Sequence, residues 1–409
     1  MVAKYVKDSL LSASMIRKLF EEGAALKQKV GHDKVFDFSI GNPDLEPPPA
    51  FHNMLLRFAT EDAIGSHGYM SNAGYADVRE KIAAKVSREH NVNTNGNNIV
   101  MSVGAAGALN VVLKAILNKG DEVIVCRPYF MEYRSYISNH NGTLIEADTK
   151  ADFNLDISEI QKRLSDKTAA VLINSPNNPT GVVYDADTIA ALSDVLMQHG
   201  KKMGRYPALI ADEPYREIVY DNIVVPPVMC HYPHTIVVTS YSKNLSLPGE
   251  RIGYIAVAND IDDKENLLAA FIWANRILGF VNAPALMQRV VAELTDEKCN
   301  VDVYAHRRSA FKKVLDNAGL QYINPQGTFY IFCKVPQTNK IQQQNYLISK
   351  PQSDKLFCDH LKKYYILAVP GSSFGASGYL RFAYCVSEDI INASAGAFKE
   401  AVNSYVPFA

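Results

Sequence analysis

The chain has 409 residues, of which 47% are hydrophobic and 21% are charged. This length exceeds what one ordinary hydrophobic core supports, so we expect two domains, and the composition is typical of a globular enzyme rather than a disordered chain. The formal net charge is −1, with lysines and acids interspersed. Such a balance argues against a nucleic-acid surface or an anionic membrane as partner.

The cysteines and the N-terminal residues bear on the compartment. The six cysteines are scattered and form no CxxC pair, which favours reduced thiols over a disulfide framework or a metal site. Residues 1–10 contain no hydrophobic core of signal length, and no window of eighteen uninterrupted apolar residues predicts a membrane span. We therefore expect a cytoplasmic protein without a bound metal.

The first ninety residues predict helices around one short strand. Residues 8–29 have the periodicity of an amphipathic helix, and residues 35–40 have that of a short strand. The proline run at 47–49 breaks regular structure and marks the crossing into the larger domain. Helices are predicted over about 50–60 and 76–90, on either side of a glycine- and tyrosine-rich loop.

From residue 98 onward, predicted strands and helices alternate. Most of the strands are continuous runs of Val, Ile and Ala, as in strands buried on both faces. The seven predicted strands are 98–104, 122–127, 143–147, 169–174, 208–211, 235–240 and 252–258. Repeated β-α units predict an α/β fold, a three-layer α/β/α domain with a mostly parallel seven-stranded sheet. Ligands of such sheets gather at the carboxyl ends of the strands.

After residue 260 the pattern becomes mainly helical and then mixed. Helices are predicted at 264–279, 284–298, 301–318, 354–364 and 387–402, with strands within 327–335, 365–369 and 379–385. The Gln/Asn-rich stretch 337–353 is interpreted as a solvated loop. These elements predict a smaller α+β domain. We expect a large domain at 45–290 and a small domain formed by 1–44 and 291–409.

Several strand ends carry residues suited to chemistry. The small residues at 102–109 would let backbone amides at a helix N-terminus approach a phosphate, although they equally suit a plain turn. Asn178 stands in a turn built from two prolines and a glycine. Asp212 follows an apolar run, and such a buried carboxylate needs a cationic partner, either an arginine or a protonated ring nitrogen. Tyr215 can donate to the same ligand.

Two further residues have both a functional and a purely structural interpretation. Tyr129 follows the second strand of the sheet and could stack on a flat ring or simply belong to the core. Arg381 lies inside an apolar strand, where an arginine generally has an anionic partner. A substrate carboxylate is one candidate for that partner.

The most informative stretch is 240–254, between two apolar runs. Lys243 follows a buried strand, where loss of water favours a neutral, nucleophilic amine that can bond to a carbonyl cofactor. The alternative is a lysine that caps the strand end and reaches solvent. Ser240, Ser242 and Arg251 could bind a phosphate nearby. Together the strand ends supply an amine, an acid, ring-oxygen donors, a stacking aromatic and a phosphate site.

The chain resembles the fold-type I pyridoxal-phosphate enzymes, specifically the class I/II aminotransferases, from about residue 35 to 400. The resemblance is most specific at 177–181 (Asn-Asn-Pro-Thr-Gly), 212–215 (Asp-Glu-Pro-Tyr) and 240–253. It implies transfer of an amino group between an L-amino acid and a 2-oxo acid, pyridoxal 5'-phosphate as cofactor, and a homodimer.

The resemblance also implies a role for each matching residue. Lys243 would bind the cofactor covalently and then move the substrate α-proton, Asp212 would pair with the ring nitrogen, and Tyr129 would stack on the ring. Tyr215 and Asn178 would bind the ring hydroxyl. The phosphate would be held by the amides of Ala105 and Ala106, by Ser240, Ser242 and Arg251, and by Tyr69 of a second subunit. Arg381 would hold the substrate carboxylate, assisted by Gly41 and Asn178.

Three departures from the family pattern stand out. Ile277 occupies a position where aspartate-specific relatives carry an arginine, which argues against strict aspartate specificity. Ala106 brings no hydroxyl to the phosphate, so binding there is left to backbone amides. The stretch 337–353 has no counterpart in the pattern.

Two other classes of function compete with transamination. One is a different reaction on the same cofactor, such as that of a C–S lyase, a decarboxylase or a cyclopropane-forming synthase; lyase-like relatives usually carry histidine where this chain has Tyr215. The other is a non-catalytic regulator, which would carry an N-terminal DNA-binding domain. Fewer than fifty residues precede the site, which makes this alternative the weakest.

Overall fold

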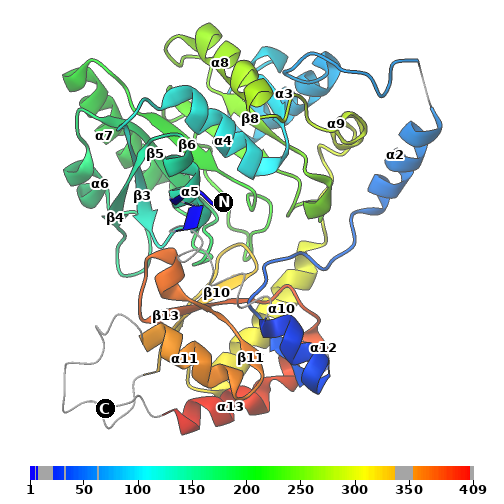
Figure 1. The fold of residues 1–409 in the computed structure, drawn as a ribbon, viewed down its shortest axis with the longest axis vertical. Helices are drawn as coiled ribbons and strands as arrows, with labels where there is room; N and C mark the ends of the chain where they lie inside the picture. Colours follow the sequence, from blue (N-terminus) through cyan, green and yellow to red (C-terminus); the bar gives the residue numbers. More distant parts are fainter. Residues whose placement is uncertain (5, 8–21, 32–33, 62–63, 337–352, 406–409) are drawn as a thin grey trace.

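The computed structural model describes residues 1–4, 6–7, 22–31, 34–61, 64–336 and 353–405. A large sheet with its helices forms one part of the molecule, and a smaller part with its own sheet lies beside it (Figure 1). Of the helix predicted over 8–29, residues 22–29 are helical, whereas 8–21 lie outside the described residues. The solvated loop predicted at 337–353 also lies outside the described residues, except for residue 353.

The large sheet has seven strands, as the sequence predicted. They are β2 (Ile99–Ser102), β3 (Glu122–Arg127), β4 (Thr143–Asp148), β5 (Thr168–Asn174), β6 (Ala208–Asp212), β7 (Thr235–Ser240) and β8 (Gly253–Val257). Their spatial order is β2-β8-β7-β6-β5-β3-β4. The pairs from β4 to β7 are parallel, and β8 runs antiparallel to both of its neighbours. The mostly parallel sheet is confirmed.

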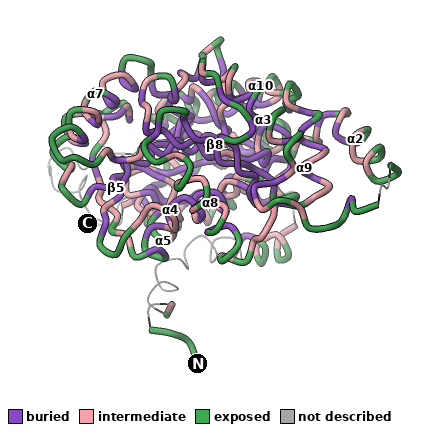
Figure 2. The backbone as a smooth tube through the Cα atoms, turned by 90° about the horizontal axis from the view of Figure 1, so that it is seen from above, coloured by how far each residue is buried: buried purple, intermediate pink, exposed green. Residues whose placement is uncertain are grey.

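Helices cover both faces of this sheet because alternate residues of each buried strand point to opposite sides. On one face lie α4 (Gly104–Ile116), α5 (Glu132–Asn139) and α8 (Lys264–Ile277), packed on residues such as Val125. On the other lie α2 (Pro49–Thr60), α3 (Ala76–His90), α6 (Ile157–Arg163), α7 (Ala186–Met203) and α9 (Ala285–Ala292), packed on residues such as Ile124. Figure 2 shows the buried residues concentrated on the strands between these layers.

The smaller part contains two short sheets and the helices that pack on them. Its elements are β1 (Phe36–Asp37), α10 (Val301–Asn317), β9 (Tyr322–Ile323), β10 (Tyr330–Lys334), α11 (Ser353–Lys362), β11 (Ile366–Leu367), β12 (Val369–Pro370), β13 (Tyr379–Ala383), α12 (Glu388–Ala393) and α13 (Ala395–Ser404). One sheet has the order β12-β13-β10-β9, and β1 pairs with β11 in the other. Phe38, Phe311, Phe382 and Phe398 pack together in its core. The smaller α+β unit is therefore confirmed.

Some predicted elements differ in detail from the observed ones. The predicted helix 284–298 ends at Ala292, and the predicted strand 365–369 is divided into β11 and β12. The predicted last helix is divided at Ser394, a buried residue whose hydroxyl bonds the Ile391 carbonyl and thus competes with the backbone ladder. Within the described residues, no helix is long and apolar enough to cross a membrane.

Candidate active site

The residues singled out in the sequence meet where β5, β6 and β7 end. These neighbouring strands run parallel, and their carboxyl ends lie at Asn174, Asp212 and Ser240. Asn174 and Asp212 are direct partners in the sheet, and the Asn174 amide donates to the Asp212 carbonyl at 2.8 Å. Lys243 follows three residues after the end of β7. The topology thus brings the acid and the amine to one edge of the sheet.

Asp212 is a buried carboxylate with one oxygen left unpaired. The Tyr133 hydroxyl donates to its Oδ2 at 2.5 Å, whereas its Oδ1 has no hydrogen-bond partner in the described part of the chain. Burial raises the pKa of Asp212 to about 7, although the hydrogen bond from Tyr133 acts in the opposite direction. A buried oxygen without a partner is costly, so this site is suited to a cationic or hydrogen-bond-donating group.

Lys243 is the amine that the sequence predicted. Its Nζ donates to the Gly41 carbonyl at 3.0 Å and lies 5.5 Å from the centre of the Phe329 ring. Burial lowers the pKa of Lys243 to about 8, and the positive charges of Arg381 and Arg251 act in the same direction. Because about a tenth of the amine is then uncharged at pH 7, far more than for an ordinary lysine, Lys243 is suited to act as a nucleophile and as a base.

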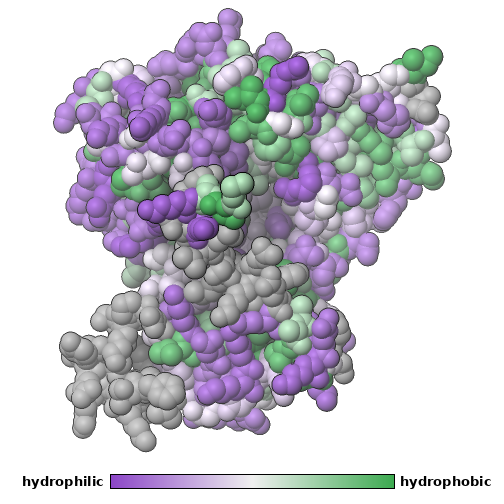
Figure 3. Space-filling view, in the orientation of Figure 1, coloured by the Kyte–Doolittle hydropathy of each residue, from purple (hydrophilic) through white to green (hydrophobic). Residues whose placement is uncertain are grey.

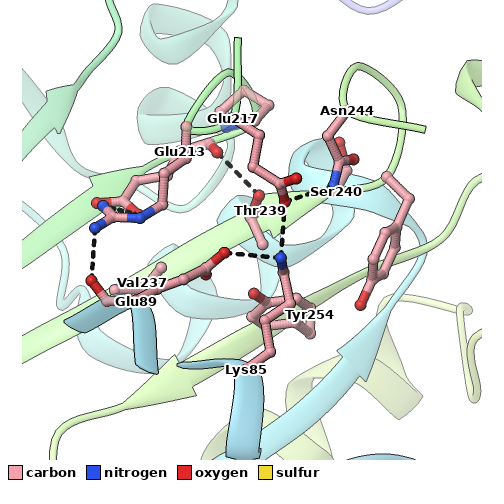
Figure 4. Close-up of a pocket in the computed structure, with 12 residues that line it drawn as sticks. Lys85, Glu89, Glu213, Glu217, Val237, Thr239, Ser240, Asn244 and Tyr254 are labelled. Carbon is pink, nitrogen blue, oxygen red and sulfur yellow. Dashed lines mark hydrogen bonds and ion pairs between the residues drawn. The ribbon is translucent and has the colours of Figure 1, made fainter. Parts of the chain in front are cut away.

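A paired charge cluster holds the Lys243 loop from the α3 side of the sheet (Figure 4). The Asn244 amide donates to Glu217 at 2.9 Å, and Lys85 lies 2.7 Å from Glu217 and 2.8 Å from Glu89. Burial alone would lower the pKa of Lys85, but the two carboxylates outweigh it and the pKa is raised. Lys85 is thus paired with both carboxylates, and the hydrogen bond from Asn244 joins the cluster to the Lys243 loop, so we assign the cluster to holding the loop in place.

The predicted phosphate-binding residues gather where α4 begins. Gly104, the first residue of α4, has a φ of +79°, and a Cβ there would lie 3.0 Å from Nη2 of Arg251. The amides of Ala105 and Ala106 belong to the first turn of α4, where helical amides lack intrahelical acceptors.

The serines of this group come from the neighbouring strand end. Ser240 donates to Ser242 at 3.1 Å and pairs in the sheet with Gly253. A Cβ on Gly253 would come within 3.0 Å of the Gly104 Cα. The two strand ends and the start of α4 therefore lie together, with Arg251 beside them, at the positively polarised N-terminus of a helix.

Arg381 reaches the same region from β13. Its Nη1 donates to Asn178 Oδ1 at 3.1 Å and its Nη2 to the Ser39 carbonyl at 2.8 Å, while its Nε has no partner among the residues that the structure describes. The ring centres of Tyr330 and Phe374 lie 4.4 and 4.9 Å, respectively, from the guanidinium carbon of Arg381. No carboxylate of the described residues lies within ion-pair distance of this guanidinium. The anionic partner that the sequence led us to expect is thus not supplied by that part of the chain.

Gly41 and Tyr215 complete the side facing the smaller part. The Tyr215 and Tyr330 hydroxyls share a hydrogen bond of 3.0 Å. A Cβ at Gly41 would lie 1.9 Å from the Tyr330 hydroxyl oxygen, so only glycine fits there. The close approach explains how the Gly41 carbonyl comes within reach of Lys243.

Two predicted residues are placed less centrally. The Tyr129 hydroxyl donates to Glu146 at 2.7 Å and accepts from Arg134, which directs it toward β4. Tyr69 is 94% exposed, so its side chain contributes nothing to the site of its own chain. Any contribution of Tyr69 would have to be made to another molecule.

Sequence reasoning missed three residues of this region. Tyr133 and Glu132 open α5, a helix that the sequence analysis did not predict, and Tyr330 lies in β10. The signal for Tyr133 was its place in a short aromatic run after β3, and only the fold shows that it reaches Asp212. In the described residues, no group of three or more His, Cys, Asp and Glu is placed to hold a metal ion.

Comparison with known proteins shows which family the chain matches. The family described as aminotransferase class I and II matches residues 33–397. The crystal structure of an amino transferase from Eubacterium rectale superposes with a TM-score of 0.91 at 36% identity, covering 99% of both chains.

Two curated relatives are named for a specific amino acid. The aspartate aminotransferase of Pyrococcus abyssi is 30% identical and covers 92% of both chains. The probable aspartate aminotransferase of Methanocaldococcus jannaschii is 28% identical over 89% of this chain and 92% of its own. The chain therefore belongs to the class I and II aminotransferases, the family that its sequence motifs predicted.

Proposed function

We propose that the side chains at the carboxyl ends of β5, β6 and β7 hold pyridoxal 5'-phosphate and carry out amino transfer between an L-amino acid and a 2-oxo acid. Class I and II aminotransferases of this fold depend on that cofactor. One observation carries the assignment: two unusual groups occur together at one edge of the sheet. Asp212 has a buried carboxylate oxygen without a partner in the described residues, and Lys243 has an amine of lowered pKa.

The residues present fit the parts of this cofactor. The unpaired Oδ1 of Asp212 would accept a hydrogen bond from the protonated ring nitrogen, and the α4 N-terminus with Arg251 would bind the phosphate. Ser240 and Ser242 would donate to the same phosphate, with Tyr69 of a second subunit. Tyr215 and Asn178 would bind the ring hydroxyl, and Tyr129 would stack on the ring.

The reaction itself divides among three side chains. When bound, the cofactor withdraws electrons from the substrate Cα, which acidifies its proton. Arg381 would hold the α-carboxylate by a bidentate pair, assisted by Asn178 and the Gly41 backbone, and so fix the direction of the Cα–H bond. Lys243, whose amine is partly neutral, would take that proton from the substrate Cα and then donate it to the next atom that needs it in the transfer.

The exposed apolar residues near Tyr69 support a homodimer. Leu56 and Ile64 are 67% and 109% exposed, and they precede Tyr69 in the same stretch of chain. Figure 3 shows apolar side chains gathered over the side of the molecule where α2 and α9 lie. A second subunit covering this side would bury them and bring its own Tyr69 to the site.

Two broader assignments complete the proposal. We place the protein in the cytoplasm, which is supported by six cysteines that are all free. We also divide the chain into a large domain, 45–290, and a small domain, 1–44 with 291–409. The pairing of β1 with β11 supports that grouping, because it joins an N-terminal strand to the C-terminal part.

Covalent attachment at Lys243 tests the proposed function. Protein reconstituted with pyridoxal 5'-phosphate should be yellow, and borohydride should abolish the colour and leave the cofactor's mass on the peptide containing Lys243. Lys243→Ala should bind the cofactor without covalent attachment and lose turnover, whereas Lys201→Ala, at an exposed residue, should behave as wild type. A Lys243→Ala variant with full turnover would contradict the assignment.

A further inference from the structure

Glu132, the first residue of α5, has a carboxylate oxygen without a partner within the described residues and precedes a residue of the candidate active site. Its Oε2 is buried and has no hydrogen-bond partner in the described part of the chain. The next residue, Tyr133, bonds Asp212, so α5 is anchored directly at the candidate active site. A carboxylate oxygen that is desolvated without a partner costs stability unless a ligand satisfies it.

The charges that act on Glu132 include that of Arg381. Burial raises the pKa of Glu132, while its own backbone amide and the positive charge of Arg381 act in the opposite direction. The Glu132 charge in turn raises the pKa values of Tyr136 and Tyr330. Within the described residues no ion pair joins Glu132 to Arg381, so the Arg381 charge acts on this carboxylate without neutralising it.

The remaining surroundings decide what a substrate can present to Glu132. Under the proposed function, Arg381 holds the α-carboxylate and the α-amino group is the one transferred, so the side chain is the part left to meet Glu132. A side-chain carboxylate would be repelled by Glu132, and Ile277 provides no cation to offset that repulsion. A side-chain ammonium or guanidinium would instead satisfy the unpaired Oε2 with a charge-assisted hydrogen bond.

From this geometry we infer that Glu132 is a specificity-determining residue that selects amino donors with a cationic side chain, that is, basic α-amino acids. The inference rests on the proposed function. It distinguishes this chain from relatives whose names specify aspartate.

Half-reactions with single amino acids test the inference on the reconstituted holoenzyme. Lysine is compared with norleucine, which has the same chain length without the charge, and with aspartate, each followed by the change in cofactor absorbance. The wild type should prefer lysine to norleucine. Glu132→Gln should lower kcat/KM for lysine by about 10- to 100-fold, the effect of losing a charge-assisted hydrogen bond, and leave norleucine nearly unchanged. Glu159→Gln, on the surface helix α6, is the matched control and should change neither.

A binding measurement separates recognition from turnover. α-Methyl-lysine, which has no α-proton to lose, should bind the wild type more tightly than Glu132→Gln by a similar factor, as measured by spectral titration. Equal losses for lysine and norleucine, or a loss specific to aspartate, would overturn the inference while leaving the aminotransferase assignment intact. If no amino acid changes the cofactor spectrum, the proposed function fails and the inference fails with it.

Discussion

Replacing Asp212 by asparagine should stabilise the cofactor-free protein while slowing the reaction strongly. The side chain is buried, its Oδ1 is unpaired, and burial raises its pKa from 3.8 to about 7. Asparagine keeps the shape and can still accept the hydrogen bond from Tyr133, but it brings no charge that must be desolvated.

The sign of the pH dependence follows from the raised pKa. Between about pH 4 and pH 7 the folded protein holds a proton on Asp212 that the unfolded chain has released, so this carboxyl lowers the stability progressively as the pH rises through that window. The difference between the two pKa values corresponds to about 4 kcal/mol at full ionisation. Asp212→Asn should therefore be more stable than the wild type by up to about 4 kcal/mol near pH 8, and by little near pH 4.

Urea unfolding of the cofactor-free proteins at the two pH values measures this difference directly. Asp166→Asn, in an exposed turn, serves as the control and should show no pH-dependent gain. With cofactor bound, the order of the two stabilities should reverse, because only the wild type gains a charge pair at the ring nitrogen. The variant should also lose activity by about 100-fold or more. A variant that is less stable than the wild type near pH 8, or equally stabilised at both pH values, would refute the reasoning.

Three further predictions concern other residues of the site. Gly41→Ala should lower kcat/KM by at least about 10-fold, because the new methyl group would collide with the Tyr330 hydroxyl and displace the carbonyl that Lys243 bonds; steady-state kinetics measures it. Tyr133→Phe should raise the pKa of the Asp212 carboxyl further, because it removes a hydrogen bond that favours the charged form, and should weaken cofactor binding by about 10-fold as measured by equilibrium titration. The protein should sediment as a dimer, and Tyr69→Phe should bind the cofactor less tightly without changing that state.

Each of these predictions has an outcome that would contradict it. Gly396→Ala adds a methyl group where nothing lies within 4 Å, so it should leave the kinetics unchanged, and equal losses in both glycine variants would contradict the steric argument. Unchanged cofactor affinity in Tyr133→Phe would show that the hydrogen bond to Asp212 does not matter for binding. A fully active monomer in sedimentation would contradict the position proposed for Tyr69.

Hydrophobic periodicity was sufficient to predict the large sheet because it is a local property. Each of the seven strands is a run of apolar residues, and all seven were predicted with ends within two residues of those observed. The short helix α5 was not predicted, since its eight residues show too weak a pattern to separate from the loop after β3. The division of the last helix at Ser394 depends on a side-chain hydrogen bond that the apolar pattern does not record.

The sequence by itself determined the fold class, the order of strands and helices, and the family, because these follow from local periodicity and from short motifs such as 212–215. Only the tertiary structure decided which oxygens of Asp212 and Glu132 have no partner in the described residues. It also decided the direction of the Tyr129 hydroxyl and the exposure of Tyr69. The physical reason is that a charge, a pKa or an unsatisfied hydrogen bond depends on neighbours contributed by distant parts of the chain. Arg381 and Asn178 are 203 positions apart and become partners only when folding brings β13 to the turn that follows β5.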